Sequence, residues 1–162
     1  MTPFQIFGLQ FALSFILYFM VVKRYVMPKL LSMPALDAFI VLAFTQVFRY
    51  IGLIFLVPGV VSGDLPQAWA GPVAYGDLAT TVLALITIVL LWNRSRAGVA
   101  MLWLTNIVGL IDLLNALFQG ASINVSVYLN AAWYIPTFVV PALLVFHWYI
   151  FKMLIKRGKE SF

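Results

Sequence analysis

The sequence contains no cysteine, a single histidine and few charged residues, which make up 9% of its 162 positions. Without cysteine, the chain cannot form disulfides, perform thiolate chemistry or hold a cysteine-ligated metal or iron–sulfur centre. The single histidine excludes haem held by two histidines and cannot build a typical zinc site. We therefore expect no cofactor, while the redox compartment of the protein stays open.

Apolar residues dominate instead, at 64% of the chain with a mean hydropathy of +1.05. Soluble domains carry roughly 25% charged residues, so this composition is typical of a protein that lives in a bilayer. The apolar runs are long enough to cross the roughly 30 Å hydrocarbon core as helices. The sequence predicts an all-α fold, one transmembrane helical domain over residues 1–162, with five spans at about 4–22, 35–57, 73–92, 98–118 and 127–151.

Basic residues lie in three groups that follow the first, third and fifth spans, so five crossings place all three groups on one side. The amino terminus and the loops 58–72 and 119–126, on the other side, contain no Lys or Arg. The positive-inside rule then predicts a cell-membrane protein with its amino terminus outside and its carboxyl terminus cytoplasmic. Because the basic residues do not form one helical face, we expect no nucleic-acid partner. The groups are Lys23, Arg24 and Lys29; Arg94 and Arg96; and Lys152, Lys156, Arg157 and Lys159.

Two ring-bearing side chains are predicted at the membrane surfaces. The connection "PGVVSGDLPQAWAGP", residues 58–72, is rich in Gly and Pro and reads as a surface loop, with Trp69 as its interfacial anchor. His147 falls near the predicted cytoplasmic end of the fifth span, beside Trp148 and Tyr149. We therefore expect His147 at the interface, in a different layer from the polar residues of the outer half.

Arg49 lies inside an apolar run, "TQVFRYIGLIF", residues 45–55. A charge at the centre of a membrane helix costs roughly 2.5–3.5 kcal/mol on insertion scales, so such residues turn inward and pair. Counting along the spans places Asp77 and Asp112 at a depth similar to that of Arg49, in the outer half. We expect Arg49 to pair with Asp112, with Asp77 or with both, although Asp77 also fits the N-cap of the third span.

Three amide side chains accompany these charges. Asn115 lies one turn above Asp112, Asn130 begins the fifth span at the same level, and Gln46 lies one turn below Arg49 on the same face. One Arg and two ionised Asp would carry a net charge of −1, which favours a bound cation or a proton held by one Asp. The predicted ligand- or ion-binding set is Arg49, Asp77, Asp112, Asn115, Asn130 and Gln46, with aromatic walls such as Trp133 and Tyr134.

Other readings of this set stay open. The ion pairs can be a structural lock on helix register, and the asparagines can be helix caps or hydrogen-bonding residues between helices. Ser, His and Asp do not share one depth, and the chain lacks a glycine-rich phosphate loop, so the sequence leans against an enzyme. Three functions compete: binding of a small ligand, cation or proton, related to transport; an accessory or structural subunit, as a homo-oligomer or in a larger membrane complex; and a lipid-modifying enzyme. The lipid bilayer is the expected partner in each.

Overall fold

The computed structural model describes residues 1–158, in which helices follow one another without a β-strand. Five helical stretches are long and apolar enough to cross a membrane, as the sequence predicts. They begin and end at Pro3–Ser32, Ala35–Leu56, Gln67–Trp92, Ala97–Ser122 and Asn130–Arg157. Lys159, expected with the basic tail, lies outside the described residues.

Three of the five stretches change helix type along their length. The first comprises α1 (Pro3–Val21), the π-helical turn η1 (Val22–Val26) and α2 (Met27–Ser32), and the second comprises α3 (Ala35–Val47) and the 3₁₀ segment η2 (Phe48–Leu56). The third and fourth are the unbroken helices α4 (Gln67–Trp92) and α5 (Ala97–Ser122). After the 3₁₀ turn η3 (Val125–Val127), the fifth comprises the 3₁₀ turn η4 (Asn130–Trp133), the π-helical turn η5 (Ile135–Val139) and α6 (Val140–Arg157).

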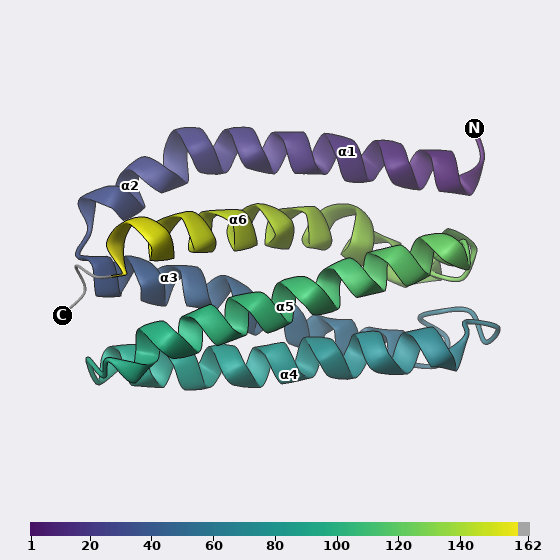
Figure 1. Cartoon of the computed structure of the whole chain (residues 1–162). Coiled ribbons are helices and arrows are strands. Elements are labelled where there is room, and N and C mark those ends of the chain that lie inside the picture. Colours follow the sequence, from purple (N-terminus) through teal and green to yellow (C-terminus); the bar gives the residue numbers. More distant parts are fainter. Residues whose placement is uncertain (159–162) are drawn as a thin grey trace.

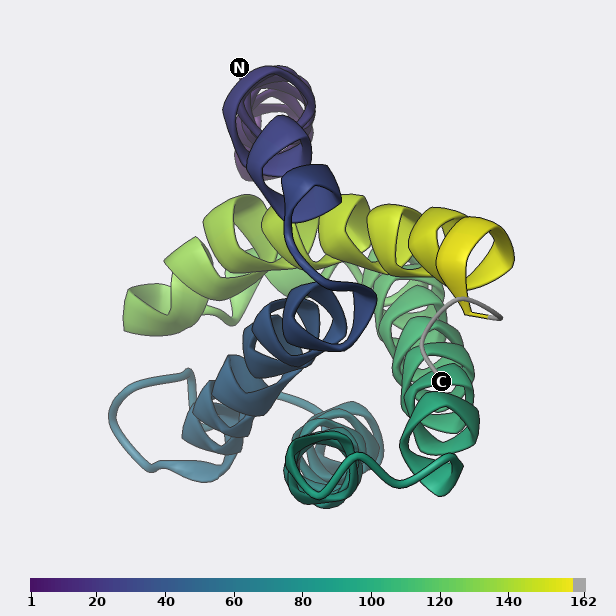
Figure 2. The same cartoon turned by 90° about the vertical axis from the view of Figure 1, so that its left-hand side faces the viewer.

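The helices form an elongated bundle in which α1 is the outermost (Figure 1). Seen along the bundle, α6 separates α1 from α3, α4 and α5 (Figure 2). Helix α1 contributes no buried residue, so it contacts the bundle through exposed and partly exposed side chains. At its beginning, Gln10 Oε1 accepts a hydrogen bond of 2.6 Å from Trp133 Nε1, and Phe7 packs edge-on against the same indole at 5.7 Å. Among the long helices of the described residues, α1 is the one that contributes no buried side chain to the interior.

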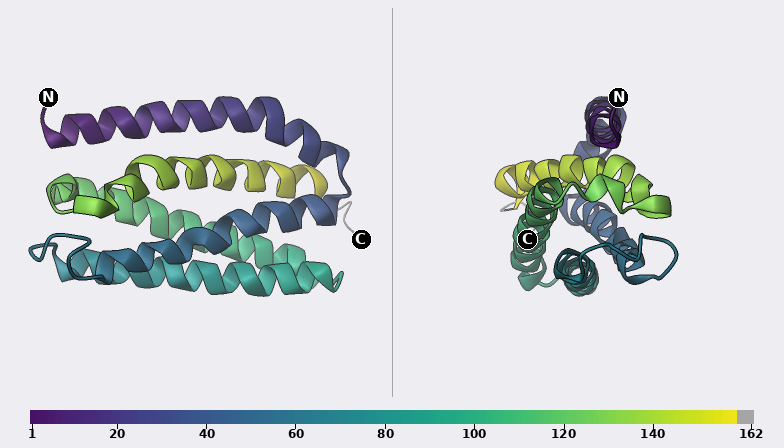
Figure 3. Two further views of the ribbon diagram at one scale, coloured as in Figure 1. Left: turned by 180° about the vertical axis from the view of Figure 1, so that it is seen from behind. Right: turned by 90° about the vertical axis from the view of Figure 1, so that its right-hand side faces the viewer.

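The two ends of the bundle differ in charge. The amino terminus and the connection from η2 to α4 lie at one end, here called the amino-terminal end (Figure 3). The turn from α2 to α3, the turn from α4 to α5 and the end of α6 lie at the other, here called the basic end. The latter holds Lys23, Arg24, Lys29, Arg94, Arg96, Lys152, Lys156 and Arg157.

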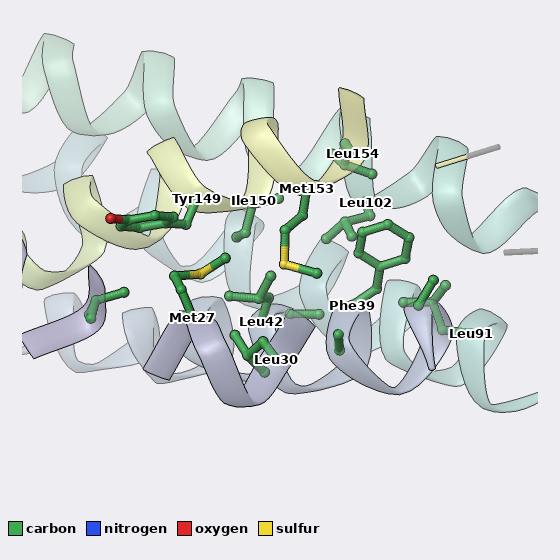
Figure 4. Packing of buried hydrophobic residues seen from close by; sticks show 14 of the residues in the cluster. Met27, Leu30, Phe39, Leu42, Leu91, Leu102, Tyr149, Ile150, Met153 and Leu154 are labelled. Atoms are coloured by element: carbon green, nitrogen blue, oxygen red, sulfur yellow. The ribbon is translucent and has the colours of Figure 1, made fainter. Parts of the chain in front are cut away.

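The interior near the basic end is a cluster of apolar side chains from α2, α3, α4, α5 and α6. Phe39 and Leu42 of α3 meet Leu102 of α5 and Ile150 of α6, and each is 0% exposed (Figure 4). Met153 fills the space between them (Figure 4). Close packing of these side chains stabilises this part of the bundle.

Two helices extend beyond the predicted spans in ways that affect the candidate site. Helix α4 begins at Gln67 rather than near residue 73, because Pro72 removes only one helical hydrogen bond close to the start of the helix. Trp69 is consequently not a loop anchor. It lies in the first turn of α4, 6% exposed, and donates from Nε1 to the Ala116 carbonyl at 3.0 Å. At the other boundary, α6 continues to Arg157 rather than ending at residue 151.

Candidate functional site

Arg49 is turned inward by a change of helix type. The α-helical run ends at Val47, and η2 continues for nine residues as a 3₁₀ helix, a type rarely longer than three or four residues. A 3₁₀ helix has three residues per turn, so residues three apart lie on one face. The buried residues of η2 are Arg49, Gly52 and Phe55, at this spacing. The helix switch therefore places the arginine, a glycine and an aromatic ring in one inward row.

Thr81, which is not in the set predicted from the sequence, stabilises this switch. Its hydroxyl lies 3.1 Å from the Val47 carbonyl oxygen, at the last residue of α3, and 3.0 Å from the Asp77 carbonyl oxygen. Carbonyl groups at a helix end lack their usual intrahelical partners, and a threonine hydroxyl can serve them instead. Thr81 is one turn from Asp77 on α4, so the same helix face supports the switch and supplies a carboxylate.

The Arg49 guanidinium binds both aspartates. Its Nε donates to Asp77 Oδ1 at 2.8 Å, and its Nη2 donates to Asp112 Oδ2 at 2.6 Å. The Arg49 side chain is 0% exposed, whereas the side chains of Asp77 and Asp112 keep 10% and 18% of their surface exposed. Asp77 lies in the interior of α4, so its alternative reading as an N-cap is wrong. The pairs tie η2 to α4 and α5 at the level expected from depth.

Three glycines make room for these charged groups. A Cβ on any of them would collide with a charged side chain, so a larger residue would displace a member of the cluster. The pairs are Gly52 with the Asp77 carboxylate, Gly76 with the Asp112 carboxylate, and Gly109 with Arg49 Nη1, Thr80 and His147. Arg49 Nη1 also donates to the Gly109 carbonyl at 2.7 Å, which the absence of a side chain permits. The glycines thus belong to the site as much as the charges do.

His147 belongs to this cluster, contrary to its predicted place at the interface. It is 0% exposed, and its Nε2 lies 3.4 Å from Arg49 Nη1. The prediction failed because the predicted fifth span ends at residue 151, six residues before the helix does. With α6 running to Arg157, His147 lies at the middle of the helix.

Asn106, on α5, determines which ring nitrogen of His147 carries the proton. The Asn106 Nδ2 donates to the His147 carbonyl oxygen at 3.2 Å, which leaves Oδ1 facing the ring. His147 Nδ1 lies 2.6 Å from this Oδ1, so Nδ1 must be the protonated nitrogen. The lone pair of Nε2 then faces Arg49 Nη1. Neutral His147 is accordingly an acceptor for the guanidinium.

The three predicted amides do not hydrogen-bond to the charged residues in the described part of the chain. Gln46 is 0% exposed and donates to Thr45 Oγ1 at 3.2 Å, while its Oε1 has no hydrogen-bond partner there. Asn115 is exposed and pairs with Gln119. Asn130 is exposed at the start of η4, with φ at 42°. Their predicted place in the set rested on depth along a helix, and depth does not determine which way a side chain points.

A cavity of about 320 Å³ adjoins the two aspartates toward the amino-terminal end. Its walls are almost entirely apolar and come from α1, η2, α4, α5, η3, η5 and the first residue of α6. The predicted walls, Trp133 and Tyr134, do not line it. The aromatic lining is Phe4, Phe7 and Phe11 of α1, Phe55 of η2, and Trp69 of α4. The spacing of the three α1 rings, with Gly8 among them, is a one-face helical pattern that could have indicated this surface.

Residues 6–155 match the family described as a domain of unknown function, DUF8737. The chain belongs to this family. No curated protein and no solved structure matches the chain. The matched residues include Arg49, both aspartates and His147, so the charged cluster lies within the family domain.

The chemistry that this arrangement offers is limited. Among residues 1–158, His, Asp and Glu side chains form no group of three that could hold a metal ion. The guanidinium contacts both carboxylates, a carbonyl and an imidazole, so its position is fixed from three neighbouring helices. Asp77 and Asp112 line the cavity, and both side chains are partly accessible. The site can therefore accept hydrogen bonds and attract positive charge at one end of an apolar chamber.

Proposed function

We propose that this multi-pass membrane protein binds a small amphipathic ligand in the cavity, with the polar end of the ligand at Asp77 and Asp112. The observation that carries the proposal is the cavity itself, whose apolar walls end on two carboxylates fixed by one buried arginine. Small-molecule sites are characteristically apolar chambers with a few converging polar groups, of about 300–1,000 Å³. The cavity is at the small end of this range, which suits one compact ligand.

In our proposal the cavity opens from the outer leaflet of the cell membrane. The basic end carries the Lys and Arg groups and would face the cytoplasm by the positive-inside rule. The cavity is nearer to the opposite end, beneath the beginning of α1. The beginning of α1, the outermost helix (Figure 2), forms one wall of the cavity, so in this proposal a ligand dissolved in the bilayer enters beside α1.

Binding is better supported than transport. On the side of the charges toward the basic end, His147 and Asn106 are followed by the hydroxyl pair of Thr87 and Thr105, which lie 2.9 Å apart. Beyond them is the apolar cluster around Phe39 and Leu42 (Figure 4). A polar ligand or ion would have to cross this cluster to leave toward the cytoplasm, so the favoured role is a site open to one side.

The second candidate is an accessory or structural role, favoured by how completely Arg49 is engaged. Its guanidinium joins η2 to α4, α5 and α6, which is what a lock on helix register requires. Such a lock explains the ion pairs but does not explain why they border a cavity. The two roles differ in one observable, namely whether filling the cavity removes a bound molecule without unfolding the bundle.

Native mass spectrometry of the purified protein, with variants that fill or spare the cavity, tests the proposal. Gly8 lines the cavity and has no atom within 4 Å of a built Cβ, so Gly8→Leu should fill the space without a clash. Gly71 on α4 also has open space but does not line the cavity, which makes Gly71→Leu the matched control. We expect the wild type and Gly71→Leu to carry a small-molecule adduct that Gly8→Leu lacks. Equal occupancy in all three would favour the structural role.

A further inference from the structure

We infer that the ligand of this cavity is an amphiphile with a hydrogen-bond-donating, positively charged end, an alkyl- or arylammonium rather than a carboxylate or phosphate. The inference rests on the proposed function and deepens it, because it assigns the chemical class of the ligand from the groups that border the cavity.

The hydrogen-bond donors around the cavity are already engaged within the protein. Trp69 Nε1 donates to the Ala116 carbonyl at 3.0 Å, and Ser126 Oγ donates to Asn124 Oδ1 at 2.8 Å. The Arg49 side chain is 0% exposed and does not line the cavity. An anionic or purely accepting ligand would therefore find no donor at the polar end, and its desolvation would go uncompensated.

Hydrogen-bond acceptors, in contrast, remain free. Each aspartate uses one oxygen for Arg49, Oδ1 in Asp77 and Oδ2 in Asp112. Within residues 1–158 no hydrogen bond reaches the second oxygen of either carboxylate. These oxygens lie against Gly52 and Gly76, and both side chains line the cavity and stay partly exposed. A ligand that brings N–H donors supplies what these oxygens lack, and an ammonium has three of them.

The charge of the cluster favours the same class. One guanidinium faces two carboxylates, which leaves one negative charge without a counterpart when both are ionised. A cation in the cavity neutralises this charge, and an anion adds to the repulsion in a medium of low dielectric constant. Five aromatic rings line the rest of the chamber, and their faces attract cations as well as apolar chains. The aromatic and apolar walls can therefore contact the apolar part of an ammonium amphiphile, and the two carboxylates can bind its ammonium group.

The test compares three probes with the same chain and different heads: octylammonium, octan-1-ol and octanoate. The full-length protein is placed in nanodiscs of neutral phosphatidylcholine, and apparent Kd values are taken from the concentration dependence of its melting temperature. For the wild type we expect octylammonium to bind at least about tenfold more tightly than octanoate, with octan-1-ol between them, because like charges repel in a buried site. Gly71→Leu should keep this order.

Variants separate the ligand class from the existence of the site. Asp112→Asn and, independently, Asp77→Asn keep the side-chain shape and should cut the preference for octylammonium over octanoate to within about threefold. A preference that persists in both variants, or equal affinities in the wild type, would overturn the inference while leaving a cavity that binds ligands. Binding of every probe that is unaffected by Gly8→Leu would instead overturn the proposed function.

A final arm identifies the source of the ammonium group. Phosphatidylethanolamine shares the ammonium chemistry with free amines but places a phosphate beside it, which would lie close to the two carboxylates. We expect nanodiscs that contain phosphatidylethanolamine to leave the octylammonium Kd within about twofold, since the phosphate repels the acids. Loss of octylammonium binding in these nanodiscs would overturn the assignment to a single-headed amine and identify the lipid as the ligand.

Discussion

The two halves of this bundle are built from the same five helices, but their interiors hold opposite kinds of side chain. Near the basic end, Phe39, Leu42 and Ile150 are 0% exposed within an apolar cluster (Figure 4). Toward the amino-terminal end, the centre of the bundle holds Arg49 and two aspartates, and a cavity of about 320 Å³ lies next to them. One half is filled with hydrocarbon, whereas the other is charged and hollow.

The difference indicates that the charged half does not hold the helices together with the most favourable free energy available. Burying an ion pair costs desolvation, and well-packed apolar residues of similar volume are often at least as stabilising. The apolar half of this same chain demonstrates that its helices can pack in that way. The charged half also needs three glycines and a helix of unusual type to accommodate it. Such local departures from simple packing rules are expected where a site is under functional selection.

The largest effect in this comparison is expected from Arg49→Met. Removing the guanidinium leaves two buried carboxylates without a partner, and breaking a buried ion pair in this way typically costs about 3–5 kcal/mol. Leu42→Met in the apolar half introduces the same residue, and volume-conserving apolar exchanges usually cost less than about 1.5 kcal/mol. Unfolding free energies of both variants in bicelles measure the contrast.

A second variant shows whether the loss in Arg49→Met comes from uncompensated charge. Adding Asp77→Asn and Asp112→Asn to Arg49→Met removes both carboxylates, so it should recover part of the lost free energy of unfolding. If Arg49→Met costs no more than Leu42→Met, the two halves are energetically alike and the comparison fails.

An intermediate effect is expected from Gly109→Ala. The added Cβ would lie 2.8 Å from both Arg49 Nη1 and Thr80 Cγ2 and 3.0 Å from His147 Cε1, so at least one of them must move. Overpacking of this kind costs about 1–3 kcal/mol. Gly8→Ala is the control, because its Cβ meets open space and alanine favours a helix over glycine by about 0.5–1 kcal/mol. We expect the changes in unfolding free energy to have opposite signs, with Gly109→Ala destabilising and Gly8→Ala stabilising. Equal signs would mean that the charged cluster rearranges around the added Cβ without a cost in stability.

The sequence was sufficient for the architecture because the relevant signals are one-dimensional. Apolar length predicted five spans, and five helices of suitable length and composition are present. Depth along each span brought Arg49, Asp77 and Asp112 to one level, and the structure pairs the arginine with both acids. Hydrophobic runs and the cost of a buried charge both act along the membrane normal, which is the coordinate that residue counting follows.

The features that the sequence did not predict depend on the direction of a side chain around its helix axis and on where each helix ends. Asn115 has a suitable depth but faces outward. The prediction for His147 was wrong because α6 continues through Lys152 and Lys156, beyond the predicted end of the span at residue 151. The 3₁₀ geometry that turns Arg49, Gly52 and Phe55 inward results from packing against α4, where Thr81 bonds the Val47 carbonyl. Such tertiary effects leave no periodic signal in one sequence.

The smallest effect concerns the bond between Asn106 and His147, which positions the imidazole toward Arg49. A double-mutant cycle with Asn106→Ala and His147→Ala isolates the ring contact at 2.6 Å, because the second bond from Asn106 goes to the His147 backbone and survives the His147 change. Hydrogen bonds between membrane helices couple by about 0.6 kcal/mol on average and about 1.7 kcal/mol at most. Because this pair is short and buried, we expect its coupling energy to be close to about 1.7 kcal/mol.

The control cycle uses Thr87→Val and Thr105→Val, whose hydroxyls lie 2.9 Å apart closer to the apolar half, and we expect the average coupling there. Nitrogen NMR of His147 adds a readout that stability alone does not provide, since the wild type should show a protonated Nδ1 and a lone pair on Nε2. Loss of this tautomer in Asn106→Ala would establish that the amide orients the ring. A coupling no larger than that of the threonine pair, with the tautomer unchanged, would instead mean that Arg49 alone holds the imidazole.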